Sequence, residues 1–158
     1  MTDYSVNQDV FDMPSEDAFP FAGLLEKEEL SYLGHLMERH CAKAGECLWR
    51  EGDTDDRLGL IVRGRVKLLK EADNPKHPLV LGLFGPGALV IDLAFVEGLP
   101  RETSAYAVED LEIFYLSRPQ FARVLAERPM LGHRIFGETL VSFAEQLRHA
   151  YRRLAVFF

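Results

Sequence analysis

The chain has 158 residues, which is enough for one domain with a substantial hydrophobic core. Hydrophobic residues make up 47% and charged residues 27%, and the two cysteines do not form a disulfide framework. No apolar run approaches the roughly 20 residues of a membrane span, and the acidic N-terminus lacks the basic and apolar regions of a signal peptide. We therefore expect a cytoplasmic protein without a membrane segment.

The acidic charge is concentrated at the N-terminus. Residues 1–30 hold eight acidic residues and one lysine, whereas the other 128 residues hold 17 acidic and 17 basic residues. The body is therefore neutral, which argues against nonspecific nucleic-acid binding, because such binding requires a basic surface. We expect residues 1–18 to form a flexible acidic leader.

The next part of the chain predicts a helix followed by short strands. Apolar residues recur at helical spacing over roughly residues 26–40. From there to about residue 117, short apolar runs alternate with Gly, Pro and Asp, which is typical of strands joined by turns. Within residues 58–70 one parity holds Leu58, Leu60, Val62, Val66 and Leu68, and the other holds Arg63, Arg65 and Lys67. We therefore expect one buried and one solvated face.

The C-terminal part predicts two helices. Ser117 and Gln120 form a capping-box pattern, and Pro129 ends the helix that they begin. Beyond it, residues 130–158 predict one long helix whose apolar residues recur at alternating steps of four and three. We expect this seam to pack on a second copy of the chain, with packing inside one chain as the alternative. The residues assigned to this homodimer seam are Phe136, Leu140, Phe143, Leu147 and Leu154.

This order of elements predicts a mainly β fold with helical ends, an eight-stranded jelly roll or β-roll. Asp92 and the residues after it predict one short helix between strands, with Arg101 at the start of the next strand. A helix N-terminus that faces an arginine suits a phosphate-sized anion. Taken singly, Asp92 also fits an ordinary helix cap, and Arg101 fits an exposed surface charge.

Glycine spacing and the segment around Arg101 resemble a known family. The stretches that carry the resemblance are Gly45-Glu-Cys-Leu-Trp-Arg-Glu-Gly52-Asp53, Leu58 to Val66 with Gly64, and Phe84-Gly-Pro-Gly87. They are similar to the cyclic-nucleotide-binding domain, the sensor module of bacterial catabolite activators, protein kinase A regulatory subunits and nucleotide-gated channels. The resemblance covers about residues 19–150.

The resemblance implies a sensor that binds cAMP or cGMP. Arg101 would pair with the cyclic phosphate, Asp92 would hold a ribose hydroxyl, and Gln146 would reach the base from the last helix. The short helix would close a β-roll over residues 19–129, and residues 130–158 would relay the bound state to an unknown protein partner. The candidate ligand-binding residues are Ile91, Asp92, Leu93, Arg101, Glu102, Thr103, Ser104 and Gln146.

The chain departs from the family pattern near the ligand. Ile91 stands where the family has glycine, Asp92 stands where it has glutamate, and Glu102 stands where it prefers a small residue. These departures favour an alternative, a degenerate module that binds no nucleotide and serves as a dimerisation or docking protein. The chain stops at Phe158, where the helix-turn-helix domain of catabolite activators would begin, so we do not expect direct DNA binding.

Other kinds of site find little support. The five histidines are scattered, without the His-x-His of a metal-binding cupin, and Cys41 and Cys47 lie six residues apart, unlike zinc or redox pairs. No Walker loop, dinucleotide fingerprint or nucleophile elbow occurs in the sequence. We therefore expect a protein that is not an enzyme and holds no metal or cofactor. A metal-free cupin-like isomerase is a third, weaker hypothesis.

Overall fold

The computed structural model of the chain describes residues 25–71 and 78–156. The acidic leader expected at residues 1–18 lies outside the described residues. The helices are α1 (Lys27–Leu36), α2 (Leu93–Glu97), α3 (Arg118–Glu127) and α4 (Pro129–Leu154). The strands are β1 (Glu38–Ala42), β2 (Cys47–Trp49), β3 (Leu58–Arg63), β4 (Val66–Lys70), β5 (Leu79–Phe84), β6 (Leu89–Val90), β7 (Ser104–Ala107) and β8 (Leu111–Leu116).

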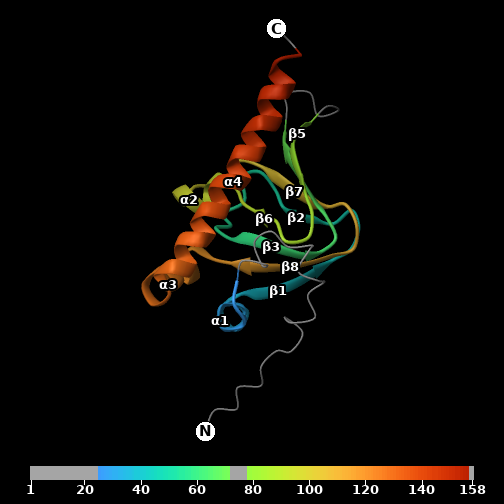
Figure 1. The fold of residues 1–158 in the computed structure, drawn as a ribbon. Helices are drawn as coiled ribbons and strands as arrows, with labels where there is room; N and C mark the ends of the chain where they lie inside the picture. Colours follow the sequence, from blue (N-terminus) through green and yellow to red (C-terminus); the bar gives the residue numbers. More distant parts are fainter. Residues whose placement is uncertain (1–24, 72–77, 157–158) are drawn as a thin grey trace.

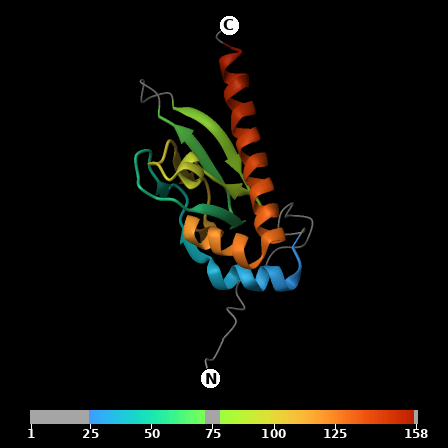
Figure 2. The same ribbon diagram turned by 90° about the vertical axis from the view of Figure 1, so that its left-hand side faces the viewer.

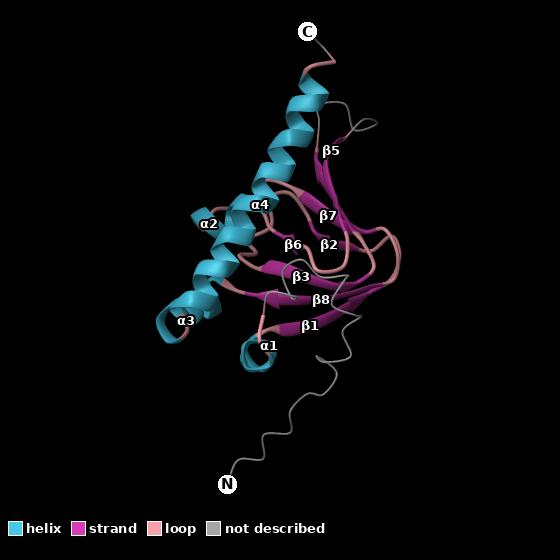
Figure 3. Cartoon of the chain, viewed as in Figure 1, coloured by secondary structure: helices cyan, strands magenta, loops and turns pink. Residues whose placement is uncertain are grey.

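The strands form two four-stranded antiparallel sheets, which confirms the predicted eight-stranded β-roll (Figure 1). One sheet has the order β1-β8-β3-β6, and the other has the order β2-β7-β4-β5. The helices gather on one side of this roll (Figure 3). In the second view α1 and α3 lie side by side, and α4 runs along the roll past β5 (Figure 2).

The protein has one apolar core between its sheets and another between a sheet and the helices. Trp49 and Ile61 belong to the first core, whereas Leu58, Leu60 and Ile91 belong to the second. Strand β3 therefore contributes to both cores and is buried from Leu58 to Val62. The solvated face predicted for this strand is wrong at Ile61, because the other sheet covers that side of β3, whereas Arg63 and Arg65 are exposed as predicted.

The first predicted helix extends four residues too far at its C-terminal end. Helix α1 ends at Leu36, Met37 is extended, and β1 pairs antiparallel with β8. Strand β1 is the edge of its sheet, and only Ala42 in it is buried. An exposed edge strand needs no apolar alternation, so the sequence carried no signal for it.

The predicted helix starts are confirmed. The Asp92 carboxylate accepts a hydrogen bond from the Ala94 N–H at the start of α2, and Ser117 and Gln120 cap α3 reciprocally. Gly64 turns the chain from β3 into β4 at a φ of 80°, and a Cβ there would overlap the Asp110 carbonyl oxygen. Among the described residues, no helix combines the length and the hydropathy needed to cross a membrane.

Candidate functional site

Arg101 lies inside the protein rather than on its surface. Its side chain is 0% exposed, although it carries a permanent charge. The main chain of Arg101 is fixed against the β2–β3 loop, since the Gly52 N–H donates to its carbonyl at 2.8 Å and its own N–H donates to the Asp53 carbonyl at 2.8 Å. The interpretation of Arg101 as an exposed charge is therefore wrong, and its burial comes from tertiary packing.

The Arg101 guanidinium is held by an aromatic ring and by oxygen atoms of the β2–β3 loop. Its Cζ atom lies 4.1 Å from the centroid of the Trp49 ring, which is a favourable cation–π geometry. Its Nη2 atom lies 3.0 Å from the Asp55 carboxylate and donates to the Arg57 carbonyl at 2.7 Å. These contacts compensate part of the cost of burying a cation.

Two of the three guanidinium nitrogens of Arg101 lack a hydrogen-bond partner. Nε and Nη1 are both buried and have none among the described residues. Buried polar atoms in folded proteins nearly always find a partner, so unsatisfied N–H groups need an explanation. An anion that accepts from these donors would provide one.

Asp92 caps α2 and also binds the turn after Arg101. We call residues 91–101, which contain α2, the cassette. The Oδ1 atom of Asp92 accepts from the N–H groups of Ala94 at 2.9 Å and Glu102 at 3.2 Å. Its Oδ2 atom accepts from the Thr103 hydroxyl. Both oxygens of this buried carboxylate are thus engaged inside the protein, and the Glu102 N–H faces a carboxylate rather than an open space.

Ile91 is a core residue. Its side chain is fully buried in the core against the helices, whereas Trp49, which stacks on Arg101, belongs to the core between the sheets. Leu93, the first residue of α2, is 44% exposed. Gln146 on α4 donates from Nε2 to the Ile91 carbonyl at 2.9 Å, so it joins the long helix to the cassette directly.

Glu102 is paired with a lysine on β4. Its carboxylate lies 3.4 Å from the Lys70 ammonium, which also contacts Glu51. Thr103 is buried and donates to Asp92, and the hydroxyl of buried Ser104 accepts from the Glu51 N–H at 2.9 Å. Of the eight predicted residues, Asp92, Glu102 and Thr103 are joined by hydrogen bonds, whereas Gln146 and Ile91 form a separate pair.

Asp55 and Arg57 were missed as partners of Arg101. Asp55 binds Arg57 through paired side-chain hydrogen bonds of 2.9 and 3.2 Å. The Arg57 guanidinium in turn lies 4.2 Å from the centroid of the Tyr115 ring, and burial raises the pKa of Tyr115 to about 12. The sequence did contain a signal for the pairing of Asp55 with Arg101, the acid-rich run after Gly52, because a buried arginine requires a nearby carboxylate.

Asp55 makes stability sensitive to acid. Burial raises the pKa of its carboxyl, but the Arg57 hydrogen bonds and the charge of Arg101 outweigh burial and lower the pKa below its usual value. The pKa of Asp55 is therefore lower in the folded protein than in the unfolded chain, where it is about 3.9. The ionised carboxylate stabilises the fold fully above the unfolded pKa, and this stabilisation is lost as the pH falls through the folded pKa.

Asp55→Asn is therefore expected to make the free energy of unfolding less dependent on pH below about pH 4. Urea unfolding between neutral and strongly acidic pH measures this slope. Asp56→Asn removes a neighbouring carboxylate and serves as the matched control. Equal slopes for the two variants would show that the Asp55 pairing does not contribute.

The described residues offer no group of three or more His, Cys, Asp or Glu side chains arranged to hold a metal ion. Cys41 is exposed, Cys47 is partly buried, and both are free thiols. The site is thus built from a buried arginine, a helix-capping carboxylate and the β2–β3 loop, on an antiparallel β-roll.

Comparison with known proteins identifies this architecture. The family model described as the cyclic nucleotide-binding domain matches residues 39–128. The cyclic AMP receptor protein of Thermus thermophilus is 27% identical over 111 residues, which cover 70% of this chain and 51% of that protein. The chain thus spans about half the length of this curated relative.

Solved structures agree with this match. A cyclic nucleotide-binding domain from Methylobacillus flagellatus superposes with a TM-score of 0.73 at 27% identity, covering 97% of this chain and 82% of that chain. The regulatory domain of Toxoplasma gondii PKA, solved with cAMP, gives 0.56 at 25% identity, covering 65% and 38%. The chain belongs to the cyclic nucleotide-binding domain family, a family of regulatory domains.

Proposed function

We propose that the protein senses a cyclic nucleotide whose phosphate is bound by Arg101. The observation that carries this proposal is the fully buried guanidinium with two N–H groups that have no partner among the described residues. A guanidinium fork matches phosphate oxygens, and the missing acceptors are what a phosphate supplies. Two of the relatives, a cyclic AMP receptor protein and a regulatory domain solved with cAMP, support a cyclic mononucleotide as the ligand.

The departures from the family pattern do not obstruct this role. Ile91 packs against the helices, and Glu102 is paired with Lys70. Asp55 is the group that competes with a phosphate, since its carboxylate already contacts Nη2 of Arg101. The ribose contact proposed for Asp92 requires one of its engaged oxygens to accept a further hydrogen bond.

The bound state would be relayed through α4. Gln146 joins this helix to the Ile91 carbonyl, so movement of the cassette changes a contact of the helix. Such coupling requires that the ligand bind two states with different affinity, typically by about 1–3 kcal/mol. A protein partner, not identified by any contact here, would receive the signal in the cytoplasm, where free thiols such as Cys41 persist.

We also propose that the protein forms a homodimer through α4. Phe136, Leu140, Leu147 and Leu154 are about half exposed on α4 in the single chain. Phe143, the remaining predicted seam residue, is partly buried and packs against the chain's own core. The proposed interface is therefore narrower than the predicted seam, because α4 turns Ile135, Thr139 and Ser142 toward the roll.

A docking module that binds no nucleotide is the second candidate. It is favoured by the internal carboxylates, because Asp55 already pairs with Arg101 and both oxygens of Asp92 are engaged. In this alternative these contacts stabilise the fold, and the protein binds a partner through its surface instead of a nucleotide in its interior.

Calorimetric titration with cAMP, cGMP and a cyclic dinucleotide distinguishes the two candidates. We expect one of them to bind well below 1 mM, and Arg101→Lys, which keeps the charge but loses the fork, to weaken binding by roughly tenfold or more. Arg50→Lys, at an exposed arginine, is the control. A folded protein that binds none of the three nucleotides would establish the docking module instead.

A further inference from the structure

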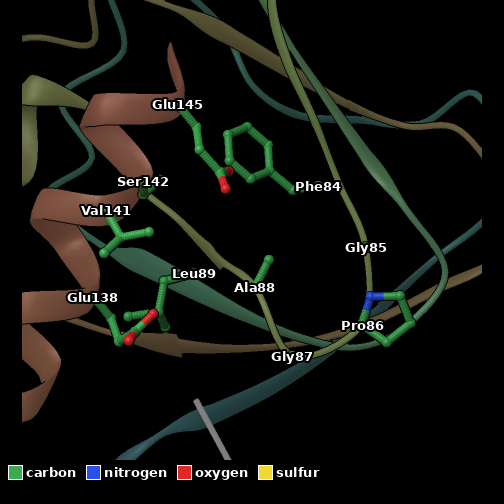
Figure 4. Close-up of a pocket in the computed structure, with 10 residues that line it drawn as sticks. All are labelled: Phe84, Gly85, Pro86, Gly87, Ala88, Leu89, Glu138, Val141, Ser142 and Glu145. Carbon is green, nitrogen blue, oxygen red and sulfur yellow. The ribbon is translucent and has the colours of Figure 1, made fainter. Parts of the chain in front are cut away.

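A pocket lies between α4 and the turn that joins β5 to β6 (Figure 4). It has a volume of about 170 Å³, and its walls come from residues 84–89 and from one face of α4. None of its lining residues is among those that contact Arg101 or Asp92. It is therefore separate from the proposed nucleotide site.

Two carboxylates face this pocket from α4. Glu138 and Glu145 both line it, and they lie seven residues apart, which is two turns or about 10.5 Å along a helix. Neither has an ion pair or side-chain hydrogen bond among residues 25–71 and 78–156. Their charge excludes a phosphate from the pocket and favours a cation.

A buried hydroxyl lies between the two carboxylates. Ser142 is only 5% exposed, it lines the pocket, and its Oγ atom has no hydrogen-bond partner among the described residues. A buried hydroxyl is normally paired. An N–H donor inside the pocket would satisfy it, which is an independent indication that a ligand with such donors binds here.

The middle of the pocket is apolar. Phe84, Leu89 and Val141 contribute its hydrocarbon surface, and in Figure 4 the Glu145 side chain extends toward Phe84 while Glu138 lies near Leu89. The pocket therefore has a carboxylate at each end and apolar walls between them.

We propose that this pocket binds a linear aliphatic diamine. Each ammonium group pairs with one carboxylate, one of them also donates to the Ser142 hydroxyl, and the methylene chain packs on Phe84 and Val141. The volume of about 170 Å³ suits a short aliphatic diamine, such as one of four or five carbons. The ligand would join α4 to the β5–β6 turn.

The test is calorimetry on the full chain with 1,4-diaminobutane, with butylamine and butane-1,4-diol as one-charge and uncharged comparisons. We expect saturable binding of the diamine, at least tenfold weaker binding of butylamine, and no binding of the diol. Glu138→Gln and Glu145→Gln should each weaken diamine binding by roughly tenfold, and Ser142→Ala should weaken it less.

A control separates this site from general attraction to an acidic protein, since the chain has a net charge of −7. Glu46→Gln makes the same charge change at an exposed residue of the β1–β2 turn and should leave diamine binding unchanged. Thermal unfolding checks that every variant is folded. Absence of saturable binding, equal binding of mono- and diamine, or an equal loss in Glu46→Gln would each overturn the proposal.

Discussion

Arg101→Glu is expected to destabilise the fold itself, by about 3–5 kcal/mol, because it breaks a buried ion pair and leaves Asp55 beside a like charge. Asp55 and the Arg57 carbonyl would lose the guanidinium donor that they now contact, and the new carboxylate would lie against the Trp49 ring. At roughly 2–4 °C per kcal/mol for a chain of this size, the melting temperature should fall by about 10 °C. Thermal unfolding followed by circular dichroism measures this effect.

The matched control for this variant is Arg50→Glu. Arg50 is exposed, so the same reversal of charge should change the free energy of unfolding by no more than about 0.5 kcal/mol. Equal melting temperatures for the two variants would contradict the burial of Arg101. This comparison also explains why Arg101→Lys, and not Arg101→Glu, is the variant suited to measuring ligand affinity.

The double substitution Leu140→Asp and Leu147→Asp is expected to convert a dimer into a monomer. These side chains are 56% and 51% exposed on α4, so the substitution costs little in the single chain. In the proposed interface it buries four unpaired carboxylates per dimer, and unpaired buried charges are strongly unfavourable. Light scattering should show the mass falling from twice 18.0 kDa to 18.0 kDa.

Val108→Asp on the β7–β8 turn provides the control, since Val108 is 40% exposed and lies off α4. It should leave the dimer intact. A dimer that survives the double substitution would show that the interface lies on another surface. A wild-type chain that is monomeric would show that the exposed apolar residues of α4 do not form a dimer.

Local signals in the sequence predicted most of the fold. Asp92 and Ser117 act as helix caps because their side chains satisfy N–H groups of their own first turns, which a short stretch of sequence reveals. The positive φ of Gly64 has the same local origin. Strand β1 was missed, because its pairing with β8 depends on residues 69 to 77 positions away.

The candidate site was predictable in its residues but not in its contacts. Arg101 was found from its place at the end of the cassette, yet its burial depends on Trp49 at the end of β2 and Asp55 in the β2–β3 loop. Likewise Glu102 appeared to face the ligand by its position in the chain, whereas Lys70 on β4 holds it elsewhere. Charges on separate segments pair according to the fold, which a one-dimensional pattern does not contain.

The stacking of Arg101 on Trp49 has a practical consequence. Trp49 is the only tryptophan in the chain, and its ring centroid lies 4.1 Å from the Arg101 guanidinium carbon. Intrinsic fluorescence therefore originates from a single indole in direct contact with this cation. Any guest that repositions the guanidinium alters the emission, so occupancy can be followed optically on the unlabelled chain.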